Sequence, residues 1–363
     1  MQRIFSALIA FLCAGQLLAG ESANSNIQPY FSFHSLGYSE TAPIHQIVIN
    51  DIEGPYFDGG RHSFTHNIIE SGAKYNGWKL AAIYRYDYSL EYSEDTAELI
   101  YGDRNNLSIE KNRQYDVELE LIHARTAGFK FGYEWSVLPE LQLGLDLSYL
   151  EVSYFLDGYL EGEFMADNDS YSGQLFIDYA YTKDLLPLDR EAEEPDGWGY
   201  ALDFSWLWQM NESWYAKGAF IDLLSQLYID EAPFTYATAN SDRVSFDDNG
   251  TIDVKPLLSG REGYRKETLS LPKQISLDVY YRINIDFEMG IAWYRYGDVN
   301  FPSIINHYNF SEGSSLKTKF DFKSEALTIG ASFPWLTISL TSDRLDYKKA
   351  RTLGFDAGVY LAF

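Results

Sequence analysis

Apolar and polar residues alternate one by one along long stretches of the chain. The pattern is clear between residues 141 and 149, between 275 and 293, between 327 and 340, and at the carboxy-terminal end. Successive side chains of a β-strand point to opposite faces, so the alternation predicts strands with one apolar face and one small or polar face. Several runs reach about ten residues, which is longer than most strands of soluble sheets.

Short turn signals separate the alternating segments into pairs. Asn76-Gly77 has the residues of a type I′ hairpin turn, and Pro334-Trp335 stands between two apolar stripes. Residues 138–140, 211–213 and 284 are similarly brief connections. The longer polar stretches are predicted as loops, at residues 94–111, 184–196, 225–268, 297–323 and 342–352. Short turns at one end and long loops at the other are typical of outer-membrane β-barrels, in which the short turns face the periplasm.

The sequence therefore predicts an all-β fold, a transmembrane antiparallel β-barrel of about 14 strands, with 12 to 16 credible, over residues 61–363. Residues 21–60 form either the first strands or an inward plug. Counting strands back from the carboxy terminus assigns each turn to one side of the membrane. This count gives one conflict, because it places the short turn Asn76-Gly77 outside and the long loop at 94–111 in the periplasm. Either one strand near residues 150–170 is miscounted or that loop is periplasmic. A secreted β-sandwich or β-propeller is the alternative fold.

The first 20 residues have the pattern of a cleaved export signal. Arg3 supplies the positive charge, residues 4–14 are apolar, and Leu18-Ala19-Gly20 offers a small-residue cleavage site. A lipoprotein signal at Cys13 is disfavoured because Leu12 occupies the position where a small residue is expected. Cleavage would remove the only cysteine, so we expect no disulfide and no thiolate metal site. No later run is long and apolar enough for a membrane-spanning helix.

The last strand pattern predicts location and partners. Its apolar stripe would face lipid and act as the barrel-assembly signal, and it includes Phe355, Val359, Leu361 and Phe363. We expect localisation in the outer membrane of a Gram-negative cell, with contacts to outer-membrane lipid, lipopolysaccharide and the barrel-assembly machinery. The aromatic content of 17%, with 29 Tyr, suits a membrane–water boundary. A net charge of −25 argues against nucleic-acid binding. The oligomeric state is open.

The polar faces of the strands supply the candidate functional residues. On these faces we count only two basic residues, Lys130 and Arg282, whereas acidic residues recur. The predicted lumen-lining and solute-binding set is Asp116, Glu118, Glu120, Glu134, Asp146, Asp178, Asp203, Asp278, Arg282, Asp286 and Glu288. Carboxylates around a low-dielectric lumen concentrate cations, so one interpretation is a channel for small polar or cationic solutes. The other is that these acids are paired with basic residues or solvate a plugged interior.

Signals for catalysis, metals and cofactors are weak. The histidines occur singly apart from His62 and His66, and two ligands do not define a zinc site. No Gly-x-Ser-x-Gly elbow is present, although Ser63, His123 and a lumen aspartate from separate strands could assemble. We expect no enzymatic activity, no cofactor and no metal.

One segment carries a family resemblance. Residues 269–277, with the sequence Leu-Ser-Leu-Pro-Lys-Gln-Ile-Ser-Leu, precede a strand and the turn at 282–284, and the chain ends in a Phe-terminated strand. These features resemble the long-chain fatty-acid transporter superfamily. The resemblance implies a 14-stranded barrel with an amino-terminal plug that passes hydrophobic substrates. The Asn-Pro-Ala motif that commonly opens that plug is absent, and only Gln28-Pro29-Tyr30 lies near.

A structural role in a secretion or surface-polymer system, carried by residues 225–268, is the remaining alternative.

Overall fold

A computed structural model describes residues 27–49, 60–166, 171–183, 196–240, 245–246, 252–253 and 257–361. The predicted export signal and Phe363 lie outside the described residues. The strands are β1 (Ile27–Ser39), β2 (His62–Tyr75), β3 (Trp78–Tyr92), β4 (Arg113–Leu138), β5 (Leu141–Ala166), β6 (Tyr171–Tyr181), β7 (Gly197–Gln209), β8 (Trp214–Asn240), β9 (Ser245–Phe246), β10 (Ile252–Asp253), β11 (Leu257–Leu269), β12 (Gln274–Arg282), β13 (Phe287–Tyr296), β14 (Val299–Ser311), β15 (Ser314–Asp321), β16 (Leu327–Phe333), β17 (Leu336–Ser342) and β18 (Thr352–Tyr360).

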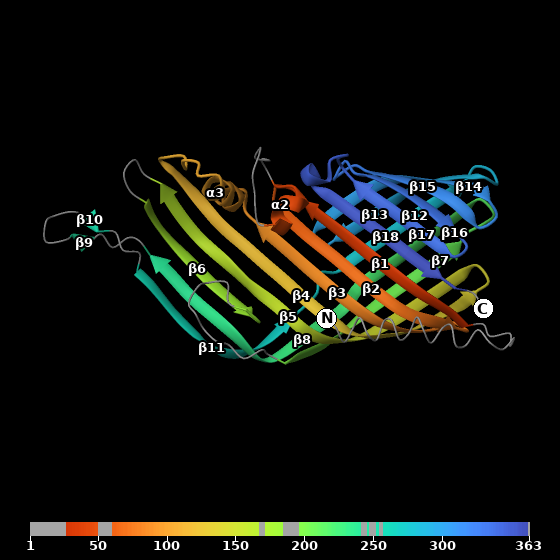
Figure 1. The fold of residues 1–363 in the computed structure, drawn as a ribbon, viewed down its shortest axis with the longest axis horizontal. Coiled ribbons are helices and arrows are strands. Elements are labelled where there is room, and N and C mark those ends of the chain that lie inside the picture. Colours follow the sequence, from red (N-terminus) through yellow and green to blue (C-terminus); the bar gives the residue numbers. More distant parts are fainter. Residues whose placement is uncertain are drawn as a thin grey trace.

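Fourteen of these strands close into an antiparallel barrel, as the alternation predicts (Figure 1). Each strand of the ring pairs with its sequence neighbour except where β5 pairs with β7 and β8 pairs with β12. β1 closes the ring by pairing with both β2 and β18. Residues 27–39 are therefore part of the barrel wall. A closed ring leaves no unpaired sheet edge at membrane depth, which is what a strand fold in lipid requires.

The outward residues of the ring form an apolar belt. Ile329 and Leu340 are 58% and 60% exposed, and Phe131 and Ile291 project in the same way from other strands. Trp and Tyr rings lie at the short-turn end of the belt, for example Trp78 tilted against Tyr133 with 4.4 Å between ring centroids. An outward apolar band bordered by aromatic rings is the pattern that a lipid bilayer selects.

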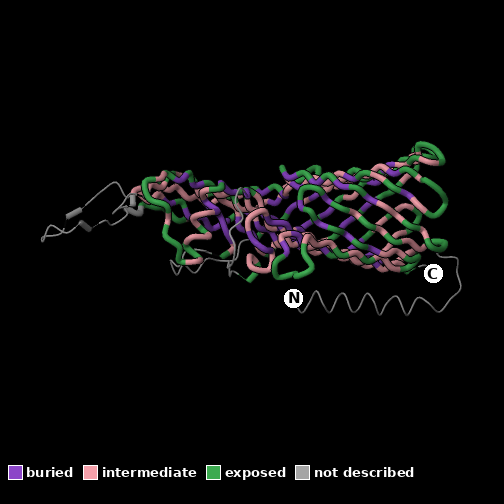
Figure 2. Tube along the Cα trace, turned by 90° about the horizontal axis from the view of Figure 1, so that it is seen from above, coloured by how far each residue is buried: buried purple, intermediate pink, exposed green. Residues whose placement is uncertain are grey.

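On one side the wall continues beyond the closed ring. We call this part the raised wall; it consists of residues 113–124 of β4, 153–166 of β5 and 227–240 of β8, together with β6 and β11. β6 pairs with β5 and β8, and β11 pairs with the other edge of β8. Figure 1 shows the raised wall on the left, away from the short-turn end, and Figure 2 shows buried residues gathered toward the middle of the long axis.

The ends of the barrel settle the counting conflict. The turns at 76–77, 139–140, 210–213, 283–286, 312–313 and 334–335 all join strands at one end, and the loop containing 94–111 lies at the other. The loop at 94–111 therefore does not lie at the short-turn end, because β3 and β4 each run once between the two ends. The loop predictions for 225–268 and 297–323 are wrong in part. β8 continues to Asn240 and β11 begins at Leu257, while β14 and β15 occupy most of 299–321.

Three helical segments lie in the connections opposite the short turns. They are α2 (Ile44–Ile49), α3 (Glu94–Arg104) and the short 3-10 helix η1 (Tyr347–Lys349). Ser93 caps α3, since its hydroxyl accepts a hydrogen bond from the Thr96 amide at 3.1 Å. Among the described residues, no helix has the length and apolar character needed to span a membrane.

Candidate functional site in the barrel lumen

The inward side chains of the strands differ in size and charge around the ring. On β16, β17 and β18 the inward faces carry mainly small residues, among them Gly330, Ser339 and Gly354. On β2, β3, β4 and β8 they carry large charged side chains. The lumen is thus filled on one side and open on the other, and this asymmetry follows directly from the sequence.

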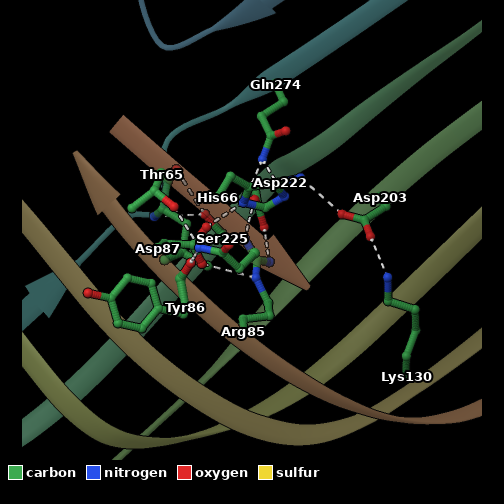
Figure 3. A network of polar contacts seen from close by, with 12 residues as sticks. Thr65, His66, Arg85, Tyr86, Asp87, Lys130, Asp203, Asp222, Ser225 and Gln274 are labelled. Carbon is green, nitrogen blue, oxygen red and sulfur yellow. Dashed lines mark hydrogen bonds and ion pairs between the residues drawn. The ribbon is translucent and has the colours of Figure 1, made fainter. Parts of the chain in front are cut away.

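A buried ion pair lies at the centre of the filled side (Figure 3). Arg85 of β3 donates from both terminal nitrogens to the Asp222 carboxylate of β8, at 2.7 and 2.8 Å. The Arg85 Nε also donates to Asp87 at 3.2 Å, and Asp87 contacts the His66 ring at 2.5 Å. Gln274 of β12 reaches the same ring at 3.1 Å. These contacts join β2, β3, β8 and β12 across the lumen.

Asp222 reaches the lumen because of a β-bulge. The β7–β8 pairing shifts between Leu202 and Phe204, so β8 carries extra residues opposite Asp203. Asp222 has a φ of 56°, in the left-handed region that residues other than glycine rarely adopt, and it is fully buried. The Asp222 amide donates to the Asp203 carboxylate at 2.9 Å, which holds the bulge. Sequence alternation did not identify Asp222, although the adjacent apolar pair Leu223-Leu224 breaks the two-residue period there.

Beside the Arg85–Asp222 pair, further acidic side chains form ion pairs with lysine and arginine side chains. Lys130 donates to Glu70 at 2.5 Å and to Asp203 at 3.2 Å. Lys79 pairs with Asp146 in the same region. Near the short-turn mouth, Lys74 pairs with Glu134 at 2.7 Å, Arg282 with Glu288 at 3.0 Å, and Lys217 with Asp278 at 3.7 Å. The count of two inward bases was therefore too low, and the acids named here are ion-paired.

The structure separates the predicted lumen residues into three groups. Glu134, Asp146, Asp203, Asp278, Arg282 and Glu288 lie within the closed ring. Asp116, Glu118, Glu120 and Asp178 lie on the raised wall instead, and Arg265 of β11 pairs with Asp178 at 2.6 Å. Asp286 lies outside the lumen, in the turn at 283–286, because β12 ends at Arg282. Ser63 bonds to Ser39 and Tyr92, whereas the His123 ring contacts Tyr86, Tyr88 and Tyr154, so these two do not form a catalytic pair.

Aromatic and apolar side chains complete this level of the lumen. Phe64 of β2 stacks on Tyr296 of β13 with ring centroids 3.9 Å apart, and Tyr38 of β1 meets Phe301 of β14 at 4.9 Å. On the side of the raised wall, a buried cluster includes Ile83, Leu150, Phe155, Leu227 and Leu271. Leu271 belongs to the Leu-Pro segment between β11 and β12, and its backbone bonds to Ser225. We call the Arg85 network, the crossed aromatic rings and this apolar cluster together the lumen layer.

Two cavities in the lumen and a groove on the raised wall provide open space. A cavity of about 430 Å³ opens near the short turns and includes Glu134, Lys217 and Asp278. A second cavity of about 230 Å³ lies against the small residues of β16 to β18 and shares Ser276 and Asp278 with the first. A groove of about 830 Å³ runs along the raised wall beside Asp116 and Glu163.

Glu40 forms hydrogen bonds and an ion pair with residues of other connections at the end opposite the short turns. Its carboxylate accepts from the amides of Arg61 and His62 at 2.8 and 3.1 Å, and from Lys323 at 2.8 Å. Burial opposes ionisation of Glu40, but the hydrogen bonds from His62, Lys323 and Arg61 outweigh it and lower the pKa of this carboxyl. The His62 ring, at the outermost position of β2, also lies 3.4 Å from the Glu40 carboxylate, and this contact raises the pKa of His62.

Comparison with known proteins gives distant structural likenesses. No family model matches the chain, and no curated protein matches it. The solved "TodX deltaS2S3 mutant monoaromatic hydrocarbon channel" is 10% identical with a TM-score of 0.48, covering 93% of this chain and 90% of that chain. The Pseudomonas putida toluene transporter TodX (10%, TM-score 0.43) covers 93% and 88%, and the CymD monoaromatic hydrocarbon channel (9%, TM-score 0.42) covers 94% and 89%.

Proposed function

We propose that this chain is an outer-membrane channel for small, mainly apolar solutes and that it does not form a standing cation pore. The observation that carries this proposal is the lumen layer. It consists of aromatic and apolar side chains from opposite walls around charges that are already paired. A solute of low polarity can replace such contacts with its own, whereas a hydrated ion would have to lose water without finding free charges.

The paired charges distinguish this proposal from the cation pore. A ring of carboxylates selects cations when its field reaches the solution in the pore. Here five acids are ion-paired with Lys79, Lys130 or Arg85, and although the acids outnumber these bases, none of their side chains is more than 20% exposed. The blockage comes from wall side chains and the Leu-Pro segment, because residues 27–39 lie in the wall and supply no plug.

Outer-membrane placement belongs to the same proposal. The apolar belt and the aromatic rings beside the short turns support insertion in a bilayer with the short turns in the periplasm. Export by the amino-terminal signal, insertion by the barrel-assembly machinery and contact with lipopolysaccharide would follow. The raised wall then stands on the extracellular side.

Single-channel recording tests the first half of the proposal. We expect the purified, refolded chain to give no steady ion conductance in a planar bilayer, while heat-modifiable migration on a denaturing gel shows that it is folded. A steady conductance with a cation-selective reversal potential would refute the proposal and restore the acid-lined pore.

Locking the lumen layer tests the second half. We expect that joining Phe64→Cys to Tyr296→Cys with a short bismaleimide slows uptake of a radiolabelled one-ring aromatic hydrocarbon by intact cells producing the chain. The matched control joins Ile329→Cys to Leu340→Cys, which are cross-strand partners on the outward face. Equal uptake in both cross-linked proteins would show that solutes do not pass through the layer.

A further inference from the structure

The cavity of about 230 Å³ in the open half of the lumen combines two kinds of lining. Lys317 and Lys319 of β15 form one part, and Tyr38, Tyr294 and Phe301 form another. The nearby strands β17 and β18 carry small inward side chains, which leave this space unfilled. An apolar hole of about 150 Å³ is enough for benzene, so this one has room for a single-ring molecule with a small substituent.

The acids around the cavity already have partners. Asp356 contacts His34 at 2.5 Å and accepts from Ser339 at 2.6 Å. Asp321 accepts from the Ser324 amide and hydroxyl, both at 2.7 Å, and from a Ser303 hydroxyl. Asp278 accepts from Tyr280 at 3.0 Å and lies 3.7 Å from Lys217.

The two lysines differ from the acids. Within the described part of the chain, neither Lys317 nor Lys319 has an ion pair or a hydrogen bond to its ammonium group. The Thr352 hydroxyl also lines the cavity, and it is buried without a hydrogen-bond partner. A buried polar group without a partner costs free energy, and the two ammonium groups, which come from alternate residues of β15, can both donate to an oxyanion in the cavity. The unmet bonding capacity of the cavity is therefore on the donor side.

We propose that this cavity binds a small aromatic carboxylate, with the ring against Tyr38 and Phe301 and the carboxylate between Lys317 and Lys319. Charge-assisted hydrogen bonds are the strong ones, and a carboxylate can accept from both ammonium groups at once. The proposal deepens the proposed function, since it rests on solutes passing the lumen layer and then reaching this cavity. It adds apolar rings that carry one negative charge to the solutes of the proposed function.

Benzoate and benzylammonium are matched probes of opposite charge. We expect benzoate to bind the refolded chain in micelles, and benzylammonium to bind at least about tenfold more weakly, by isothermal titration calorimetry. The double variant Lys317→Gln/Lys319→Gln should weaken benzoate about tenfold or more, which corresponds to the loss of one charge-assisted hydrogen bond. Lys317→Arg should largely retain binding. Lys74→Gln is the control, since it also removes a positive charge but Lys74 lies at the short-turn mouth beside Glu134.

Each outcome bears on the proposal. Equal binding of the two probes, or unchanged benzoate binding in the double variant, overturns it. If the double variant fails to migrate as a folded barrel, the single variants and the probe comparison on the unmodified chain decide instead. Binding in micelles needs no transport, so benzoate binding with unaffected uptake after cross-linking would reject the proposed function and keep the cavity assignment.

Discussion

Removing the Asp222 carboxylate is expected to destabilise the barrel strongly. Asp222 is 0% exposed and Arg85 is 2% exposed, so loss of the aspartate leaves a buried guanidinium. Breaking such a pair by removing one partner costs about 3–5 kcal/mol. Arg85 keeps its bond to Asp87 at 3.2 Å, which places Asp222→Asn near the lower limit, at about 3 kcal/mol. Asp222→Ala should cost about 1–2 kcal/mol more, because alanine is strained at a φ of 56° and asparagine tolerates it.

Urea unfolding of the refolded chain in lipid vesicles, followed by tryptophan fluorescence, measures these differences. Glu134→Gln is the matched control, since the Glu134–Lys74 pair is 50% and 36% exposed and should cost at most about 1 kcal/mol. Asp222→Gly should be more stable than Asp222→Ala, because glycine removes the strain but not the loss of charge. The reasoning is refuted if Asp222→Asn costs no more than Glu134→Gln, or if the glycine and alanine variants are equal.

Three further predictions concern the belt, the rim and a turn. Ile329→Arg should destabilise the barrel in vesicles by about 2–4 kcal/mol by urea titration, because it places a charge in lipid, while Glu212→Arg in the short turn at 210–213 should change little. Because Glu40 raises the pKa of His62, their interaction is complete below about pH 6.5 and is lost as pH rises through the raised value. Hydrogen exchange at the His62 amide, corrected for intrinsic rates, should therefore speed up across that interval, and Glu40→Gln should abolish the pH step; a step that persists contradicts the assignment. Gly77→Ala should cost about 1 kcal/mol or more, since φ is 84° and the new Cβ would lie 2.4 Å from a β4 carbonyl oxygen; an unchanged midpoint would show that the turn relaxes.

The barrel itself was predictable because its signal is periodic. Alternation sets which side chains face lipid, and it correctly places Leu277 and Leu340 outward and Asp278 and Asp356 inward. Strand ends were less predictable. Lys317 and Lys319 fell in a predicted loop, although Leu316 and its neighbours continue the two-residue period through them.

The state of the lumen was not predictable from single strands. Whether Asp203 is free or paired depends on Lys130, two strands away in the ring, and on a bulge that no periodic pattern encodes. The two-residue alternation of β3 is enough to place Arg85 in the lumen. It does not place its partner Asp222 there, because the bulge moves that residue out of register. Pairing across a lumen is a property of the closed ring, and it appears only when strands far apart in sequence are brought together.

The raised wall gives the molecule a height that differs around its circumference. β5 has 26 residues, and at about 3.3 Å per residue and a tilt of about 40° it rises roughly 65 Å, whereas the lipid belt needs only about 25 Å. On that side the protein therefore projects some tens of ångströms past the bilayer surface, while the opposite side, where β15 has only 8 residues, ends close to it. A molecule that approaches this end meets a wall on one side only, so its direction of approach becomes a determinant of access.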